Sequence, residues 1–361
     1  MKARLLDMGM VSPLRSQSIY HGVTESMQPD SDVAISIMQP SRPYVSVGYF
    51  QETEREVDLA YCDSRGMPVF RRHVGGGAVL LDSNQLFFHV MLPVAKAQAF
   101  GLPKRLTERF AYLARPPILA YRRLGVEAEF RPINDIHVHG RKIGGTGVGE
   151  IGEGLVFAGS MMLDFDAALM VKVLRITNEK MRDKVVESLD QYMTTLAREL
   201  GAKPEAAAVA ETLVSAFEDA FGLDLVPAAL TPDELSAVEH WDGVLADPEW
   251  LHQVRLKEAD ARTVKISESV RVLHAERKAP GGMMRLTLRT VDGRIAEMLL
   301  SGDFPASPQD ALGALAQAFQ GAPLDRAALN ARLHAALATS RLDIAGVEES
   351  DLNLLMQQVT S

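Results

Sequence analysis

Two arginines stand just ahead of three consecutive glycines in the segment RRHVGGGAVLLD, residues 71–82. Glycine costs backbone entropy, and a plain hairpin needs no more than two glycines at its turn. Three of them leave backbone N–H groups unshielded, so an anion or a flat ring can lie against them. Because side chains alternate along a strand, only one of Arg71 and Arg72 is expected on the glycine side. The segment predicts an anion-binding loop, with a flexible turn beside solvated arginines as the alternative.

A second segment that could do chemistry is NDIHVHGRKIGGTG, residues 134–147. Asn134 and Asp135 are adjacent oxygen donors, suited to Mg²⁺ or to orienting a polar ligand. Lys142 follows a turn at Gly140 and precedes a glycine pair, so its ammonium can neutralise a phosphate or a carboxylate as a point charge. The alternative is an ordinary lysine on a surface hairpin.

Three other patterns are weaker indications of a functional site. His137 and His139 are expected to share one strand face, but no third ligand is near in sequence, so a structural or solvated pair is favoured over a metal site. GVGEIG, residues 147–152, matches the glycine pattern of dinucleotide-binding loops, yet a strand-like run follows where a helix is required. Cys62 lies at an expected helix end, with no histidine close in sequence, and is predicted to be a core thiol.

These segments need strands and helices to position them. Strands are predicted over 43–50, 84–94, 154–165, on either side of the three glycines and on either side of Gly140. Residues 105–126 have helical spacing that Pro116 and Pro117 must interrupt. Residues 166–222 are predicted to be helical, 225–250 to be a connection, and the part beyond to be a small α+β unit with an Asp292–Gly293 hairpin turn.

Composition limits the class of protein. A chain of 361 residues suits two domains, and 47% hydrophobic residues supply a core. The net charge of -9 argues against general nucleic-acid binding, and no apolar stretch is long enough to span a membrane. One cysteine allows no intramolecular disulfide and no multi-cysteine metal site. We expect a cytoplasmic protein that binds neither nucleic acid nor membrane.

Four elements, in this order and spacing, resemble the lipoate–protein ligase family. They are VSVGYFQE with Gly48 and Gln51, RRHVGGGAV with Asp82, NDIHVHGRKIGG, and GLVFAGSMMLDFD with Gly159 and Ser160. The resemblance covers most of residues 1–240, and the part from about 250 resembles the small accessory domain of that family.

The resemblance implies a fold and an activity. The fold is α+β: a catalytic domain of the biotin/lipoate ligase type with a mixed, mainly antiparallel sheet, over residues 1–245, and a small α+β accessory domain over residues 246–361. The activity is conversion of lipoate, with ATP and Mg²⁺, to lipoyl-adenylate, followed by transfer to a lysine of a lipoyl carrier. That carrier is a dehydrogenase E2 domain, the glycine-cleavage H protein or a lipoyl carrier of sulfur oxidation.

The resemblance also implies roles for particular residues. Lys142 is the expected catalytic residue, in contact with the carboxylate and the α-phosphate. The lipoyl-adenylate site is expected to comprise Arg72, Gly75, Gly76, Gly77, Val79, Asn134, Asp135 and Gly159. Asp135 is the expected Mg²⁺ ligand, Val79 is expected to line a tunnel for the dithiolane tail, and Gly159 is expected to leave room for the ligand.

The chain departs from the family pattern at three other positions. Val74 stands where members usually have serine, Leu81 where they have histidine, and Thr146 where serine is common. Two other functions remain open. An ATP-independent octanoyl or lipoyl transferase would need a cysteine shortly before the lysine loop, where none is present. A catalytically inactive protein that binds lipoyl carriers or lipoate could have kept the pocket without turnover. A biotin ligase fits the Arg-Arg and triple-glycine pattern less well.

Overall fold

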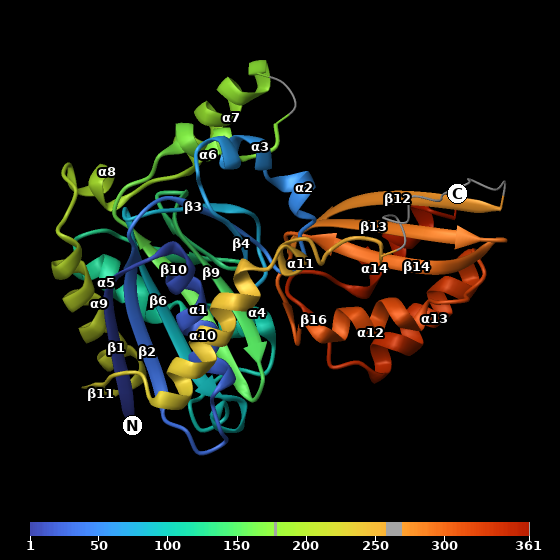
Figure 1. The fold of residues 1–361 in the computed structure, drawn as a ribbon. Coiled ribbons are helices and arrows are strands. Elements are labelled where there is room, and N and C mark those ends of the chain that lie inside the picture. Colours follow the sequence, from blue (N-terminus) through green and yellow to red (C-terminus); the bar gives the residue numbers. More distant parts are fainter. Residues whose placement is uncertain (177–178, 258–268, 361) are drawn as a thin grey trace.

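The computed structural model describes residues 1–176, 179–257 and 269–360 (Figure 1). In its larger part, strands in the order β11-β1-β2-β6-β10-β9-β8-β7 form one mixed sheet. Their bounds are β1 (Lys2–Val11), β2 (Val33–Pro40), β6 (Gln85–Pro93), β7 (Glu129–Arg131), β8 (Asp135–Val138), β9 (Arg141–Ile151), β10 (Gly154–Met162) and β11 (Asp224–Pro227). β1 runs parallel to β11 and β2, whereas the pairs from β2 to β7 are antiparallel. The predicted fold class, a mixed and mainly antiparallel sheet with helices, is confirmed.

Helices cover both faces of this sheet. One face packs against α1 (Pro13–Glu25) and α10 (Pro232–Ala246), and the other against α4 (Leu106–Leu113), α5 (Arg115–Arg123) and α9 (Ala206–Phe221). β6 lies between the two layers and is buried along its whole length, as its continuous apolar run indicates. The predicted interruption of 105–126 is confirmed, because α5 begins next to its two prolines.

The prediction that residues 225–250 are a connection is wrong. β11 extends the sheet beside β1, and α10 packs against α1 through Val238, Trp241 and Leu245. Some of the prolines and acidic residues that suggested a loop form the start of this helix, where Pro232 occupies the first turn and Thr231 and Glu234 make a capping box.

A smaller sheet holds the segment with the three glycines. It has the order β4-β3-β5, with β3 (Tyr44–Val47), β4 (Val69–Arg71) and β5 (Val79–Leu81). Around it, and at the sheet ends, lie α2 (Thr53–Glu56), α3 (Leu59–Ser64), the short 3₁₀ helix η1 (Val94–Lys96), α6 (Ala167–Val173), α7 (Glu179–Tyr192) and α8 (Leu196–Leu200). Cys62 of α3 is buried in a cluster with Val45, Leu80 and Met170, which confirms the predicted core thiol.

The C-terminal part has its own hydrophobic core and lies beside the larger part (Figure 1). Its sheet is β12 (Val270–Ala279), β13 (Gly282–Val291) and β14 (Arg294–Gly302), accompanied by β15 (Ala306–Ser307), β16 (Asp343–Ile344), α12 (Asp310–Ala318), α13 (Arg326–Thr339) and α14 (Glu349–Gln358). The hairpin predicted at Asp292–Gly293 joins β13 to β14, with both residues at positive φ.

The segment between the two parts begins with α11 (Pro248–Leu251), which still packs on the larger part. The guanidinium of Arg71 donates hydrogen bonds to the carbonyls of Trp250 and Leu251. Among the described residues, no helix is both long enough and apolar enough to cross a membrane.

Candidate functional site

The three glycines form a loop between β4 and β5 that rests on the end of β3. A Cβ atom on Gly48 would lie 1.8 Å from the carbonyl oxygen of Gly76, so only glycine permits this approach. The N–H of Gly48 donates to Oε1 of Gln51 at 3.0 Å. The glycine and glutamine singled out in the sequence therefore support the loop from beneath.

The two adjacent arginines point to different places, as alternation predicts. Arg72 donates to the carbonyls of Gly75 and Gly77, both at 2.8 Å, and to that of Ser46 at 2.9 Å. Arg71 is fully buried and donates to carbonyls of Gly48 and of the segment after α10. Burial lowers the pKa of Arg72 to about 10, so its guanidinium is still charged at neutral pH. Arg72 fixes the carbonyl side of the loop and places a cation beneath it.

The loop presents its N–H groups differently. In the described part of the chain, the backbone N–H groups of Gly75, Gly76 and Gly77 donate no hydrogen bond. All three residues line the same cavity. Because the carbonyls are held by a buried cation, the loop has the N–H donors and the positive charge that an anion requires.

Lys142 and Asp135 form an ion pair at the other segment. The Nζ atom of Lys142 lies 2.7 Å from Oδ1 of Asp135, and both side chains are partly exposed in the cavity. Gly145, opposite Asp135 in the β8–β9 register, leaves room for the lysine, since a Cβ there would lie 3.1 Å from Nζ. The cation is positioned by a strand and a carboxylate rather than by a mobile loop.

Asn134 has a structural role in this hairpin. Its Nδ2 donates to the carbonyl of Thr146 at 2.6 Å, and its own carbonyl accepts from the Thr146 N–H and hydroxyl. These bonds join the residue before β8 to the middle of β9. The hydroxyl of Thr146 thus keeps a defined function although it replaces the serine common in the family.

The histidines of this segment do not share a face. β8 ends at Val138, and His139 lies exposed in the turn with a φ of 49°. His137 is fully buried, with Nε2 3.7 Å from Oδ2 of Asp135. Alternation fails here because the strand ends one residue after His137.

A cavity of about 750 Å³ brings both segments together. Its sheet face carries small residues between β8 and β6. Ala158 pairs with Gly147 on one side and His89 on the other, and Ser160 pairs with Phe87. Three strand spacings of about 4.8 Å separate β8 from β6, so the part of the cavity that lies over these strands extends about 14 Å across the sheet. We call this part the groove. It runs from the Lys142–Asp135 pair to His89.

The far end of the groove is lined by the polar side chains of Gln17, Tyr20 and His89. Tyr20 donates from its hydroxyl to Gln17 at 3.3 Å and stacks on His89 at 4.6 Å. Nδ1 of His89 lies 2.9 Å from the hydroxyl of Ser36, and burial lowers the pKa of His89 to about 3. Tyr20 and Gln17 come from α1 and carry no local motif, so sequence reasoning did not find them.

Two other residues that were predicted to form the site, Val79 and Gly159, line the cavity. Val79 of β5 lies on its wall. Gly159 also lines the cavity, but the interpretation that its missing side chain leaves room for a ligand is wrong: a Cβ there would lie 2.5 Å from Cζ of Phe88. Glycine is required at this position by the core behind the sheet.

The two remaining substitutions relative to the family pattern are apolar contacts. Val74 is buried, and a Cβ on Gly147 would lie 2.9 Å from its Cγ2 atom. Leu81 of β5 pairs with Tyr44 and packs against the cluster that contains Tyr20. Neither residue supplies a polar group to the cavity.

The C-terminal part closes one rim of the cavity. Lys278, Gly282 and Asp303 are among its lining residues, and a Cβ on Gly75 would lie 2.8 Å from the carbonyl of Phe304. Gln309 donates to the carbonyl of His73 at 2.8 Å and accepts from the N–H of Glu150 at 3.1 Å. The glycine loop is therefore held from both parts of the chain.

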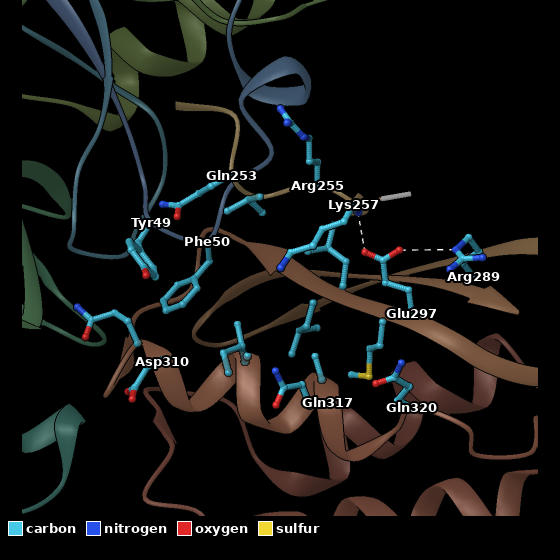
Figure 2. Close-up of a pocket in the computed structure, with 18 of the residues that line it drawn as sticks. Tyr49, Phe50, Gln253, Arg255, Lys257, Arg289, Glu297, Asp310, Gln317 and Gln320 are labelled. Atoms are coloured by element: carbon cyan, nitrogen blue, oxygen red, sulfur yellow. Dashed lines mark hydrogen bonds and ion pairs between the residues drawn. The ribbon is translucent and has the colours of Figure 1, made fainter. Parts of the chain in front are cut away.

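A second cavity, of about 560 Å³, lies between Phe50, the segment that follows α11 and the C-terminal part (Figure 2). In Figure 2, Glu297 stands between the backbone of Lys257, whose N–H donates to it at 2.6 Å, and Arg289. None of the residues predicted from the sequence to form the site lines this cavity.

A tight metal site made by the protein alone is not present in the described residues, since no three of their His, Cys, Asp or Glu side chains form a group that could hold an ion. Asp135 offers one partly exposed carboxylate in the cavity. Mg²⁺ is usually held by one or two carboxylates together with substrate phosphates, and this donor set fits that arrangement.

Relatives known by sequence include both transferases and ligases. The chain is 28% identical to octanoyltransferase LipM of Kyrpidia tusciae over 231 residues, which cover 58% of this chain and 82% of that protein. It is 26% identical to lipoate-protein ligase LplJ of Bacillus subtilis over 266 residues, which cover 73% of this chain and 74% of that protein.

Solved structures share the fold. The bipartite lipoate protein ligase of Thermoplasma acidophilum, described together with its E2 lipoyl domain, matches 71% of this chain and 99% of its own with a TM-score of 0.64 at 24% identity. LipL1 of P. falciparum, in complex with lipoate, matches 99% of both chains with a TM-score of 0.69 at 13% identity. The lipoyl protein ligase A/B catalytic domain matches residues 13–218, more than half of the chain, and the protein belongs to that family.

Proposed function

We propose that this protein is an ATP-dependent lipoate–protein ligase, which forms lipoyl-adenylate and passes the lipoyl group to a lysine of a lipoyl carrier. One observation carries the proposal: the cavity holds the Lys142–Asp135 pair facing an N–H-rich loop, and no thiol lines it. Adenylate formation needs charge neutralisation between a carboxylate and an α-phosphate, which a lysine and free N–H donors provide.

A transferase that works through a thioester needs a thiolate at the reacting carbon. The chain has one cysteine, Cys62, buried in α3 and absent from the cavity lining. Burial raises the pKa of its thiol to about 11, which opposes thiolate formation at neutral pH. The match with LipM takes in 82% of that transferase but 58% of this chain, so the transferase is the shorter protein.

The residues of the site divide the work as follows. Lys142 contacts the acyl carboxylate and the α-phosphate as charge moves between them. The N–H groups of Gly75–Gly77, with Arg72 beneath, hold the adenylate phosphate, and Val79 and the small residues of β9 and β10 contain the acyl chain. Asp135 would hold Mg²⁺ that arrives with ATP, and the ion would add positive charge at the phosphates.

The second substrate of the proposed reaction is a lipoyl carrier domain. The ligase of Thermoplasma acidophilum is described with an E2 lipoyl domain, which supports a carrier of this type. In the proposal, residues 1–245 form the catalytic domain and residues 246–361 the accessory domain.

The test is pyrophosphate release from ATP, measured with and without lipoate. Wild type is expected to release pyrophosphate only with lipoate. Lys142→Ala is expected to lower kcat about 100-fold or more, because it removes a transition-state cation. Arg141→Ala, which removes the neighbouring cation paired with Glu199, serves as the matched control and keeps its activity.

The same assay, together with a measurement of acyl transfer from an octanoyl carrier without ATP, separates the ligase from the transferase. Lipoate-dependent release that is unchanged in Cys62→Ser supports the ligase. Acyl transfer from an octanoyl carrier without ATP, abolished in Cys62→Ser, would overturn it in favour of the transferase. Neither reaction in wild type, with lipoyl domains present, would indicate a binding protein.

A further inference from the structure

His137 is an anomaly in the strand that carries Asp135. Its side chain is fully buried, and neither ring nitrogen has a hydrogen-bond partner among the described residues. Buried polar groups are nearly always hydrogen-bonded, because an unsatisfied donor or acceptor destabilises the fold. The flanking residues, Ile136 and Val138, are buried and apolar. A third apolar residue would fit this strand at lower cost, so packing does not account for the imidazole.

The imidazole lies beside the charged end of the groove. Nε2 of His137 is 3.7 Å from Oδ2 of Asp135, about 0.5 Å beyond hydrogen-bond distance, while the other carboxylate oxygen is 2.7 Å from Lys142. His137 also faces Lys142 across the β8–β9 pairing. Tyr192 of α7 donates to the same Oδ2 at 3.3 Å, and its ring meets the imidazole edge-on at 5.7 Å.

The ion pair of the resting site conflicts with the proposed reaction. The charge of Lys142 is partly neutralised by Asp135, yet Lys142 has to act on the acyl carboxylate and the phosphate. When a substrate anion draws the ammonium away, Oδ1 of Asp135 would be left to the Mg²⁺ that arrives with ATP, and Oδ2 keeps only the 3.3 Å bond from Tyr192. A carboxylate in a partly buried cavity then needs a further donor, and Nε2 of His137 lies 3.7 Å from Oδ2.

We propose that His137 is a positioning residue that takes the carboxylate of Asp135 when Lys142 engages the substrate. A neutral imidazole with its proton on Nε2 is sufficient, so no change of protonation is involved. A small rotation of the Asp135 side chain exchanges one partner for the other. The unsatisfied imidazole of the resting structure is the donor kept for the engaged state. This inference rests on the role proposed for Lys142.

The first test needs no turnover and so stands apart from the proposed function. In Lys142→Ala, Asp135 has lost its cation, and His137 is expected to donate to it. In protein labelled with ¹⁵N-histidine, the Nε2 proton of His137, assigned by its absence in His137→Gln, is expected to move downfield in Lys142→Ala relative to wild type. An unchanged resonance would overturn the proposal.

The second test uses pyrophosphate release and separates positioning from folding. His137→Val is expected to lower kcat about tenfold with the KM for lipoate unchanged, while thermal unfolding occurs at the same or a higher temperature. His137→Gln retains an N–H donor and is expected to restore most of kcat. His139→Val, in the exposed turn, is the matched control. In an Asp135→Asn background, His137→Val is expected to have no further effect, and additive losses would overturn the proposal.

Discussion

His89 lines one end of the groove, and His137 lies behind the other end, next to Asp135; both are buried and stand on strands of the same sheet. Nδ1 of His89 is hydrogen-bonded to Ser36 at 2.9 Å, and its ring stacks on Tyr20. His137 has no hydrogen-bond partner among the described residues and stands 3.7 Å from a carboxylate. Equal burial therefore accompanies two different functions. His89 forms part of the cavity wall, whereas His137 is proposed to keep a donor for another state.

The two histidines also differ in the charge of the side chains around them. At the His89 end, the groove is closed by Tyr20 and Gln17, and burial keeps the imidazole uncharged. At the His137 end, Lys142 and Asp135 are partly exposed and carry opposite charges. The neutral end suits recognition of an acyl tail, and the charged end suits phosphate and carboxylate chemistry. The small residues of β9 and β10 connect the two.

The largest expected effect is acid destabilisation from the neutral histidines. Burial lowers the pKa of His89 to about 3 and that of His73 to about 4, against 6.5 in an unfolded chain. The unfolded chain therefore binds these protons first. Stability is fully present above pH 6.5 and is lost as the pH falls toward 4 and then 3. Each of these two histidines is expected to lower the free energy of unfolding by about 2 kcal/mol between neutral pH and pH 5.

Urea denaturation at pH 7.5, 6 and 5 measures this loss. His89→Leu is expected to flatten the dependence of the unfolding midpoint on pH, since it removes one of the three histidines, His21, His73 and His89, whose pKa burial lowers. His334→Gln changes an exposed histidine and should leave the dependence as it is in wild type. A midpoint that does not move between pH 7.5 and 5 would contradict the assignment of these histidines as neutral.

A smaller effect is expected when His89 is made to resemble His137. Ser36→Ala removes the hydroxyl beside Nδ1 and leaves that buried atom without a partner. The free energy of unfolding is expected to fall by about 1–3 kcal/mol, with kcat for pyrophosphate release unchanged. His137→Val, which removes an unsatisfied imidazole, should change stability in the opposite direction or not at all. Loss of stability in His137→Val equal to that in Ser36→Ala would abolish the distinction between the two histidines.

Sequence reasoning reached the parts of this fold that depend on local pattern. The apolar run of β6 and the interruption at Pro116 were predicted, because burial on both faces and a missing N–H act within a few residues. α10 was not predicted, because its proline and the two acidic residues after it, which mark a helix start, are also typical of a loop. There, the capping-box spacing of Thr231 and Glu234 was the available signal.

The site was predictable where glycine or lysine chemistry is local and not where packing decides. The glycine loop and Lys142 carry their own signals. Tyr192 reaches Asp135 from a helix 57 residues away, and Tyr20 reaches the groove from α1, so neither has a local motif. Gly159 was misinterpreted because the atom that excludes its side chain, on Phe88, belongs to the neighbouring strand. The sequence of one strand does not show on which face of the sheet a side chain of the neighbouring strand lies.

The last prediction separates the two ends of the groove. Ala158 lies between Gly147 and His89 in the sheet register and lines the cavity. Ala158→Leu adds three carbons where the acyl chain is proposed to lie, so the KM for lipoate is expected to rise about tenfold, or ~1.4 kcal/mol, with the KM for ATP unchanged. Ala331→Leu, on the exposed side of α13, controls for the substitution itself. If Ala158→Leu raised the KM for ATP and spared that for lipoate, the acyl chain would lie elsewhere, and the His89 end would have no part in recognising it.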